Sequence, residues 1–293
     1  MNYNQFIATI KDKVLLSFDD NFSIQIHKAL KNNGRKRIGL TITDTRINVS
    51  PTIYLEEYFH LYTNGVSLET IAEQIVNTYH EVKFKQKCNV QTIKDFSTIR
   101  HKVAYKIIHG DKNKQLLQTH PHIIYLDFAI VFYILYDIDE SGSATIPITH
   151  ELLKCWETST DELWKLARIN TPLLLPADYK PMQVVIKEML GELYTEDGMA
   201  ENLMYVLTNS LRTFGACCLL YDGILEQIGD KLGENFYLLP SSIHEIIIVP
   251  ESKSPDEDCL HEMVVDINES QVAEEEFLSD NVYYYNRLTK QII

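Results

Sequence analysis

A hydroxyl, an imidazole and a carboxylate follow one another closely near residue 240. Ser241 and Ser242 come directly after a Leu-Pro pair, and His244 and Glu245 begin an apolar run. These groups are the ingredients of nucleophilic catalysis, in which a base activates a hydroxyl and a third group orients the base. Side chains alternate along a strand, so Ser242 and His244 would share one face and Glu245 the other. Ser242, His244 and Glu245 are therefore candidate catalytic residues.

The same residues also have a structural interpretation, which the pattern favours. Neighbouring positions on one strand rarely aim at a common reacting atom, and catalytic triads usually combine distant segments. Ser241 and Ser242 would then bond backbone groups in the turn after Pro240, and His244 would fill a half-buried face of a sheet.

A second polar group follows an apolar run at residue 208. Asn209, Ser210 and Arg212 precede Gly215. An amide and a guanidinium at the end of a strand could grip a carboxylate or a phosphate, so Asn209 and Arg212 are candidate binding residues. A tight polar turn in which Gly215 permits an unusual backbone angle explains the same residues more simply. The turn is the favoured interpretation.

Metal and nucleotide motifs are weak. His120 and His122, with Asp127 five residues further on, are metal-type ligands, but a zinc site needs a third ligand and none is evident. His261-Glu262 lacks the second histidine of a zincin, because Val265 stands in its place. The chain has neither G-x-G-x-x-G nor G-x-x-x-x-G-K-[ST]. The sequence predicts no metal and no cofactor.

Charge is unevenly shared along the 293 residues, whose net charge is −14. Residues 1–126 hold 17 Lys and Arg against 11 Asp and Glu, and residues 127–293 hold 10 against 30. The contrast predicts a mildly basic α+β region at 1–115 and an acidic α+β domain at 116–293, although undirected drift of surface charge gives the same pattern. The overall charge makes nucleic acid an unlikely partner, and the basic cluster Arg35, Lys36 and Arg37 is too small to reverse that.

Cysteine usage and hydropathy predict a cytoplasmic protein. Residues 1–12 carry no apolar run typical of a secretory signal. The longest apolar stretch, 123–136, is shorter than the roughly 20 residues of a membrane-spanning helix. Because the cysteines are odd in number and form no C-x-x-C, reduced thiols fit better than a disulfide framework. They are Cys88, Cys155, Cys217, Cys218 and Cys259.

Apolar periodicity predicts helices mixed with mainly antiparallel strands, an α+β fold. Predicted helices cover 2–16, 68–79 after an N-cap at Ser67, a segment after Thr149, a segment from Ser159 or Thr160 to Thr171-Pro172, 181–190, 224–232, and 260–267 after Ser254-Pro255. Predicted strands cover 22–26 and 38–42 around a turn at 32–34, then 103–107, 203–208, 216–220, 236–239, 243–249 and 282–285.

The continuous apolar run at 125–136 is ambiguous. Its aromatic and β-branched residues, with the turn residues at 139–142, favour a long buried hairpin with a second strand at 144–149. A buried helix is the alternative, because periodicity does not separate the two in a fully apolar run.

Four blocks of the sequence resemble an uncharacterised domain-of-unknown-function family of gut-dwelling Gram-positive bacteria. They are residues 126–132, 170–172, 204–209 (MYVLTN) with Gly215-Ala216 following, and 239–245 (LPSSIHE). The resemblance covers nearly the whole chain and is most specific over residues 120–290. It implies a cytoplasmic bacterial protein, with no established activity, cofactor or catalytic residue.

Two hypotheses for function follow. The leading one is a non-catalytic cytoplasmic protein that acts through contacts with an unknown protein partner, without membrane attachment and with an undefined oligomeric state. The alternative is a hydrolase-type enzyme that uses Ser242 and His244, with Asn209 or Arg212 as an anion contact. Convergence of these side chains in an open pocket would favour the enzyme.

Overall fold

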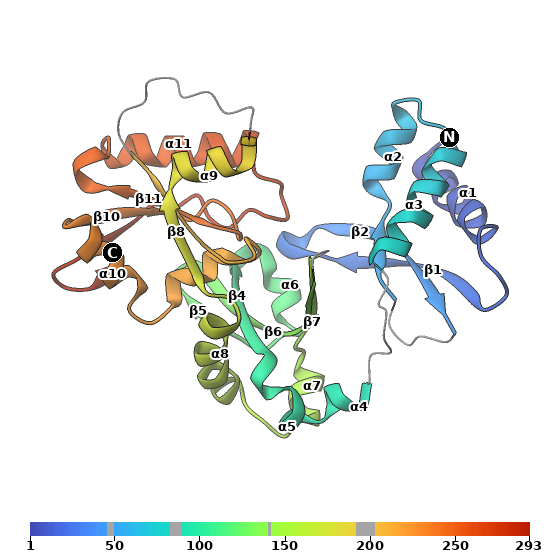
Figure 1. The fold of residues 1–293 in the computed structure, drawn as a ribbon, viewed down its shortest axis with the longest axis horizontal. Helices are drawn as coiled ribbons and strands as arrows, with labels where there is room; N and C mark the ends of the chain where they lie inside the picture. Colours follow the sequence, from blue (N-terminus) through green and yellow to red (C-terminus); the bar gives the residue numbers. More distant parts are fainter. Residues whose placement is uncertain (46–49, 83–89, 140–141, 192–202) are drawn as a thin grey trace. The chain divides into compact units, whose positions relative to one another are not determined.

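The computed structural model describes residues 1–45, 50–82, 90–139, 142–191 and 203–293. They form two compact units (Figure 1). Unit 1 comprises Met1–Thr98 and Asp137–Ala144, and unit 2 comprises Ile99–Tyr136 and Thr145–Ile293. Residues 99–115 therefore belong to unit 2. The division into charge-distinct regions at 1–115 and 116–293 stays a prediction.

Unit 1 contains a three-stranded antiparallel sheet in the order β1-β2-β3. Its elements are α1 (Tyr3–Leu15), β1 (Phe22–Leu30), η1 (Asn32–Gly34), β2 (Lys36–Asp44), β3 (Thr52–Tyr54), α2 (Glu56–Thr63), α3 (Leu68–Val82) and α4 (Val90–Lys94). The predicted hairpin is confirmed, and Asn33 and Gly34 take the positive φ angles of 57° and 70° that its turn requires. The predicted N-cap is confirmed too, because the Ser67 hydroxyl accepts the Thr70 N–H at 3.1 Å.

Unit 2 contains a first sheet in the order β4-β6-β5, with β7 also paired to β6. The helix α5 (Phe96–Ile99) spans the boundary between the units, and the ends of β6 and β7 within Asp137–Ala144 are counted with unit 1. The elements of this part are η2 (Arg100–Lys102), β4 (Val103–His109), η3 (Asp111–Asn113), α6 (Lys114–Leu117), β5 (His122–Tyr125), β6 (Phe128–Asp139), β7 (Gly142–Pro147), α7 (His150–Cys155) and α8 (Thr160–Leu174). The apolar run is therefore strand, and the helix alternative is wrong. A turn at Leu126, whose φ is 55°, divides it into β5 and β6. Of the predicted turn at 139–142, residues 140–141 lie outside the described residues.

A second, six-stranded antiparallel sheet has the order β13-β12-β10-β11-β9-β8. Its elements and their connections are β8 (Ala177–Pro181), α9 (Met182–Leu190), β9 (Tyr205–Asn209), η5 (Gly215–Leu220), α10 (Ile224–Leu232), β10 (Phe236–Leu239), β11 (Ile246–Pro250), η6 (Glu251–Lys253), α11 (Glu257–Ser270), β12 (Tyr283–Asn286) and β13 (Gln291–Ile292). Leu260 and Val264 of α11 pack on Leu239 and Val249 of the sheet. Helices α9 and α11 lie on the same side of this sheet (Figure 1).

One predicted element and one predicted helix end are wrong. The segment 216–220 is the 3₁₀ helix η5 rather than a strand; Gly215 to Leu219 are all buried, so no alternation between two faces exists to define a strand. Helix α8 does not end at Thr171-Pro172 but runs through Pro172 to Leu174. The buried Thr171 holds this turn, because its hydroxyl donates to the Ala167 carbonyl at 2.6 Å and accepts the Tyr105 N–H of β4 at 3.2 Å.

The fold of the described residues is α+β, as predicted. None of their helices combines the length and the apolar character needed to cross a membrane. Cys155, Cys217, Cys218 and Cys259 are free thiols, and Cys88 lies outside the described residues.

Candidate functional site

Ser242 lies in the connection from β10 to β11, where its side chain accepts a backbone hydrogen bond. Its side chain is buried, and its Oγ accepts the backbone N–H of His244 at 3.0 Å. Residues 241–243 run antiparallel to residues 276–278, with Ile243 N–H donating to the Glu276 carbonyl at 2.8 Å and an isolated bridge between Ser242 and Phe277. The predicted strand at 243–249 consequently begins only at Ile246.

The His244 ring is held by a neighbouring turn. Its Nδ1 accepts the backbone N–H of Phe214 at 3.3 Å, and the two rings stack with centroids 5.9 Å apart and planes at 12°. The Lys106 ammonium of β4 lies 3.8 Å from the centroid of the Phe214 ring. The His244 Nε2 is 3.7 Å from a carboxylate oxygen of Glu276. Because Nδ1 accepts a backbone hydrogen bond, that lone pair is not open to a serine hydroxyl.

Glu245 is the partly buried carboxyl of this group. Burial raises the pKa of its carboxyl, and the nearby His244 and a hydrogen bond from Ser242 oppose that rise. Within the described part of the chain, no hydrogen bond joins the Ser242 hydroxyl to the His244 ring. Ser242, His244 and Glu245 therefore lie together without the hydroxyl–imidazole contact that would activate a nucleophile.

A second stack of the same composition lies beside the first. The His109 ring stacks on Phe277 with centroids 5.6 Å apart, and the Lys112 ammonium lies 3.4 Å from the centroid of that ring. Burial is the main cause of a lowered His109 pKa. Phe277 is next to Glu276, whose carboxylate lies 3.7 Å from His244, so both stacks lie against the same loop.

The candidate binding residues have partners inside the protein. Asn209 is fully buried; its Oδ1 accepts the N–H groups of Leu211 and Thr213 at 3.1 and 3.4 Å, and its Nδ2 donates to the Thr213 carbonyl at 2.8 Å. Arg212 pairs with Glu188 of α9. The structure thus places Asn209 as the centre of a turn and Arg212 on its surface.

Gly215 has a different role from the one predicted. The positive φ angles of this turn belong to Arg212 and Phe214, at 52° and 56°. A Cβ on Gly215 would lie 2.5 Å from the His244 carbonyl oxygen and 2.7 Å from the Asn209 nitrogen. Glycine is required here because two backbone segments approach closely, rather than for an unusual backbone angle.

The candidate metal ligands His120 and His122 contact backbone carbonyl groups. The Nδ1 atoms of His120 and His122 lie 2.9 Å from the carbonyl oxygens of Leu116 and His120 respectively. No group of three or more metal-ligating side chains occurs among the described residues.

Asp127 instead anchors a later segment of the chain. Its carboxylate accepts hydrogen bonds from the Ser279 hydroxyl at 2.5 Å, the Asn281 amide at 3.0 Å and the Tyr283 hydroxyl. This residue at the β5–β6 turn therefore fixes the strand β12 and the residues that lead into it.

Unit 2 contains a groove of about 670 Å³. It lies against both β5 and β13, each the outermost strand of its sheet. Two ion pairs, Arg168–Asp222 and Lys290–Glu226, border it. The uncharged lining is mainly apolar and aromatic: Ile123, Tyr125, Ile130, Trp164, Leu219, Leu220, Tyr221, Gly223, Leu225, Tyr285, Gln291 and Ile292.

Sequence reasoning missed several residues of these sites. Phe214 contacts His244 and Lys106 contacts Phe214, each from another element, and no local motif marks them. The groove draws on β5, α8, η5, α10, β12 and β13 together. The sequence predicted individual elements that contribute to the groove, among them the apolar run at 125–136 with Tyr125 and Ile130 and the strand at 282–285 with Tyr285, but not their convergence.

The fold and the groove define an α+β protein with an aromatic cleft between two sheet edges. The sequence matches the family of unknown function DUF5688 over residues 3–287, and the chain belongs to this family. Neither the curated proteins nor the solved structures contain a significant match to the chain.

Proposed function

We propose that the protein is a non-catalytic binding protein that takes an extended segment of a partner protein into the groove between β5 and β13. The observation that carries this proposal is the groove itself, a large cleft with aromatic and aliphatic side chains and two ion pairs in its lining, bounded by two outermost strands. The internal engagement of Asn209 and Arg212 and of the His244 Nδ1 supports a binding role over the hydrolase alternative.

An extended segment fits because outermost strands offer unused backbone groups. In an antiparallel pair, every second residue of β5 directs its N–H and C=O away from β6. Among the described residues, no further strand pairs with β5. Ile124 is 60% exposed and Leu126 is 42% exposed at this edge. A partner strand would gain main-chain hydrogen bonds here, and alternate side chains would enter the aromatic groove.

The expected partner segment is apolar with basic flanks. Tyrosine, tryptophan and arginine, which line the groove, are the residues enriched at protein interfaces. Residues 127–293 carry 30 acidic side chains against 10 basic ones, and such an excess attracts positively charged partners.

Peptide selection on the immobilised full chain tests this function. A display library of linear peptides should yield apolar sequences with flanking lysine or arginine, beyond those that bind an unrelated protein of equal net charge. The variants Tyr125→Ser and Ile292→Ser should weaken the selected peptides by roughly tenfold, since each removes apolar contact area of the groove. The matched control is Leu173→Ser, because Leu173 is 75% exposed on α8 and does not line the groove.

Two results would contradict the proposal. Equal peptide affinity in the groove variants and the parent chain would remove the groove as the binding site. Hydrolysis of an ester or amide substrate that disappears in Ser242→Ala, while folding is retained, would establish the hydrolase alternative instead.

A further inference from the structure

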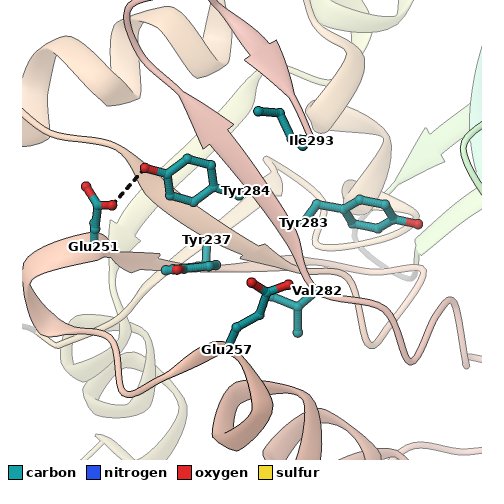
Figure 2. A pocket seen from close by; sticks show the side chains of 7 residues that line it. All are labelled: Tyr237, Glu251, Glu257, Val282, Tyr283, Tyr284 and Ile293. Atoms are coloured by element: carbon teal, nitrogen blue, oxygen red, sulfur yellow. Dashed lines mark hydrogen bonds between the residues drawn. The ribbon is translucent and has the colours of Figure 1, made fainter.

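A second pocket, of about 300 Å³, lies on the face of the six-stranded sheet toward α11 (Figure 2). Its central pair is Tyr237 of β10 and Tyr284 of β12, which are direct partners in the register of the two strands. Their ring centroids are 5.1 Å apart, with planes at 59°. Two aromatic faces thus meet at a concave surface whose remaining lining is Glu251, Glu257, Val282, Tyr283 and Ile293.

Two carboxylates border the aromatic pair. Glu251 accepts the Tyr284 hydroxyl at 2.8 Å and the Asn235 amide at 3.0 Å, so it is fixed in place (Figure 2). Glu257 rises from the first turn of α11, and Figure 2 shows its carboxylate directed toward the strands.

The pKa values of both tyrosines are raised, first by burial and then by these carboxylates. Burial, followed by Glu257 and Glu251, raises the pKa of Tyr237. Burial, followed by Glu251, raises the pKa of Tyr284. Within the described residues, no lysine or arginine forms an ion pair with Glu251 or Glu257 and none lies over either ring. The pocket therefore combines aromatic faces with two carboxylates that have no basic counterpart there.

We propose that this pocket binds an organic cation, an alkylammonium or alkylguanidinium group. The rings of Tyr237 and Tyr284 attract a cation through their negative faces, and the carboxylates accept its N–H groups. Val282 and Ile293 supply apolar surface for the alkyl stem. The Tyr284 hydroxyl donates to Glu251, which places a carboxylate beside this ring.

This site is independent of the groove proposed for a partner segment. Side chains alternate along β12, so Tyr284 faces α11 while Tyr285 lines the groove on the opposite side. Loss of one binding activity therefore need not affect the other, and the two proposals can fail separately.

The test uses three probes with the same alkyl stem: n-butylammonium, n-butylguanidinium and neutral n-butanol. Titrations of the full chain are followed by nuclear magnetic resonance of selectively labelled tyrosine rings. Both cations should shift the signals of Tyr237 and Tyr284 and should bind at least ~10-fold more tightly than butanol, because only they gain charge-assisted hydrogen bonds and ring contacts.

Charge-matched variants separate the pocket from the general field of an acidic protein. Glu251→Gln with Glu257→Gln should weaken cation binding at least ~10-fold, because it removes both charged acceptors. Glu262→Gln with Glu269→Gln removes the same charge from exposed positions of α11 outside the pocket and should change affinity less than ~2-fold. Tyr284→Phe should retain part of the binding, whereas Tyr284→Leu should lose more.

The source of the cation is distinguished by two further probes. Tighter binding of spermidine than of a blocked Ala-Lys-Ala peptide identifies a free polyamine, and the reverse order identifies a side chain of a peptide. Equal affinity for butanol and the butyl cations, or an equal loss in both double variants, would overturn the proposal. A thermal unfolding curve of each variant confirms that folding is retained.

Discussion

The ring of His244 lies flat on the ring of Phe214, and its Nδ1 accepts the Phe214 backbone N–H. A phenylalanine in the left-handed region, at φ 56°, needs compensation from its surroundings. The stack and the hydrogen bond provide it, and the carbonyl of His244 accepts the Thr208 hydroxyl at 2.8 Å. The imidazole thus joins the 209–215 turn to the 240–245 connection.

Replacement of His244 separates the stack from the hydrogen bond. His244→Phe retains an aromatic ring but leaves the Phe214 N–H without an acceptor, so unfolding free energy should fall by about 1–3 kcal/mol. His261→Phe, at an exposed position on α11, should change it by less than about 0.5 kcal/mol. Urea unfolding monitored by circular dichroism measures both. Unchanged stability in His244→Phe would contradict a bracing role for the imidazole.

Two glycine-to-alanine changes should have opposite effects. Gly215→Ala forces a Cβ against the His244 carbonyl and the Asn209 nitrogen, both backbone atoms, and should cost about 3 kcal/mol. Gly229→Ala, within α10, meets the flexible side chain of Arg287 at 3.3 Å and makes an ordinary contact with the Phe236 ring at 3.6 Å, so it should gain up to about 1 kcal/mol from helix propensity. Denaturant midpoints of the two variants provide the comparison, and a similar sign for both would refute the close-approach account.

Thr171 should be sensitive to loss of its hydroxyl alone. Thr171→Val keeps the shape but removes the acceptor of the Tyr105 N–H, so it should destabilise unit 2 by about 1–3 kcal/mol. Thr171→Ser retains the hydroxyl and should lose less. Protection of the Tyr105 amide against hydrogen exchange is the direct measurement. Equal protection in the valine and serine variants would show that the hydroxyl is not required.

Glu245 should give stability a dependence on pH. Burial raises its pKa in the folded state, so above the unfolded value the folded protein holds the proton more tightly than the unfolded chain does. The contribution of Glu245 to the unfolding free energy therefore falls as pH rises from the unfolded pKa to the raised folded pKa. Glu245→Gln should remove this fall and be more stable than the parent at neutral pH. Unfolding curves over acidic to neutral pH measure the difference, and parallel pH profiles would contradict it.

Local signals predicted much of the fold. The hairpin turn at Asn33-Gly34, the cap at Ser67 and the end of α10 at Gly233 depend on short-range backbone chemistry, which the sequence displays directly. The incorrect predictions fall in segments whose structure is determined by tertiary packing. Pro172 continues a helix because Thr171 is tied to β4, and η5 lies among buried neighbours on all sides.

The candidate sites were less predictable. The sequence did not predict which side chains contact Ser242, His244 and Asn209, because Phe214 and Glu276, the partners of His244, come from segments that no motif marks. The pocket at Tyr237 and Tyr284 depends on the pairing of β10 with β12, which only long-range register defines.

The hydrogen bonds of Asp127 have a consequence for how the chain folds during its synthesis. Its partners Ser279 and Tyr283 lie 152 and 156 positions later, and β12 stands between β10 and β13. A nascent polypeptide that extends only through α11 lacks the hydrogen-bond donors to Asp127 and lacks the strand β12 that pairs with β10. The native structure of unit 2 therefore forms only after Ser279 and β12 have been synthesised, and a product truncated before Ser279 would expose an unpaired sheet edge that favours association.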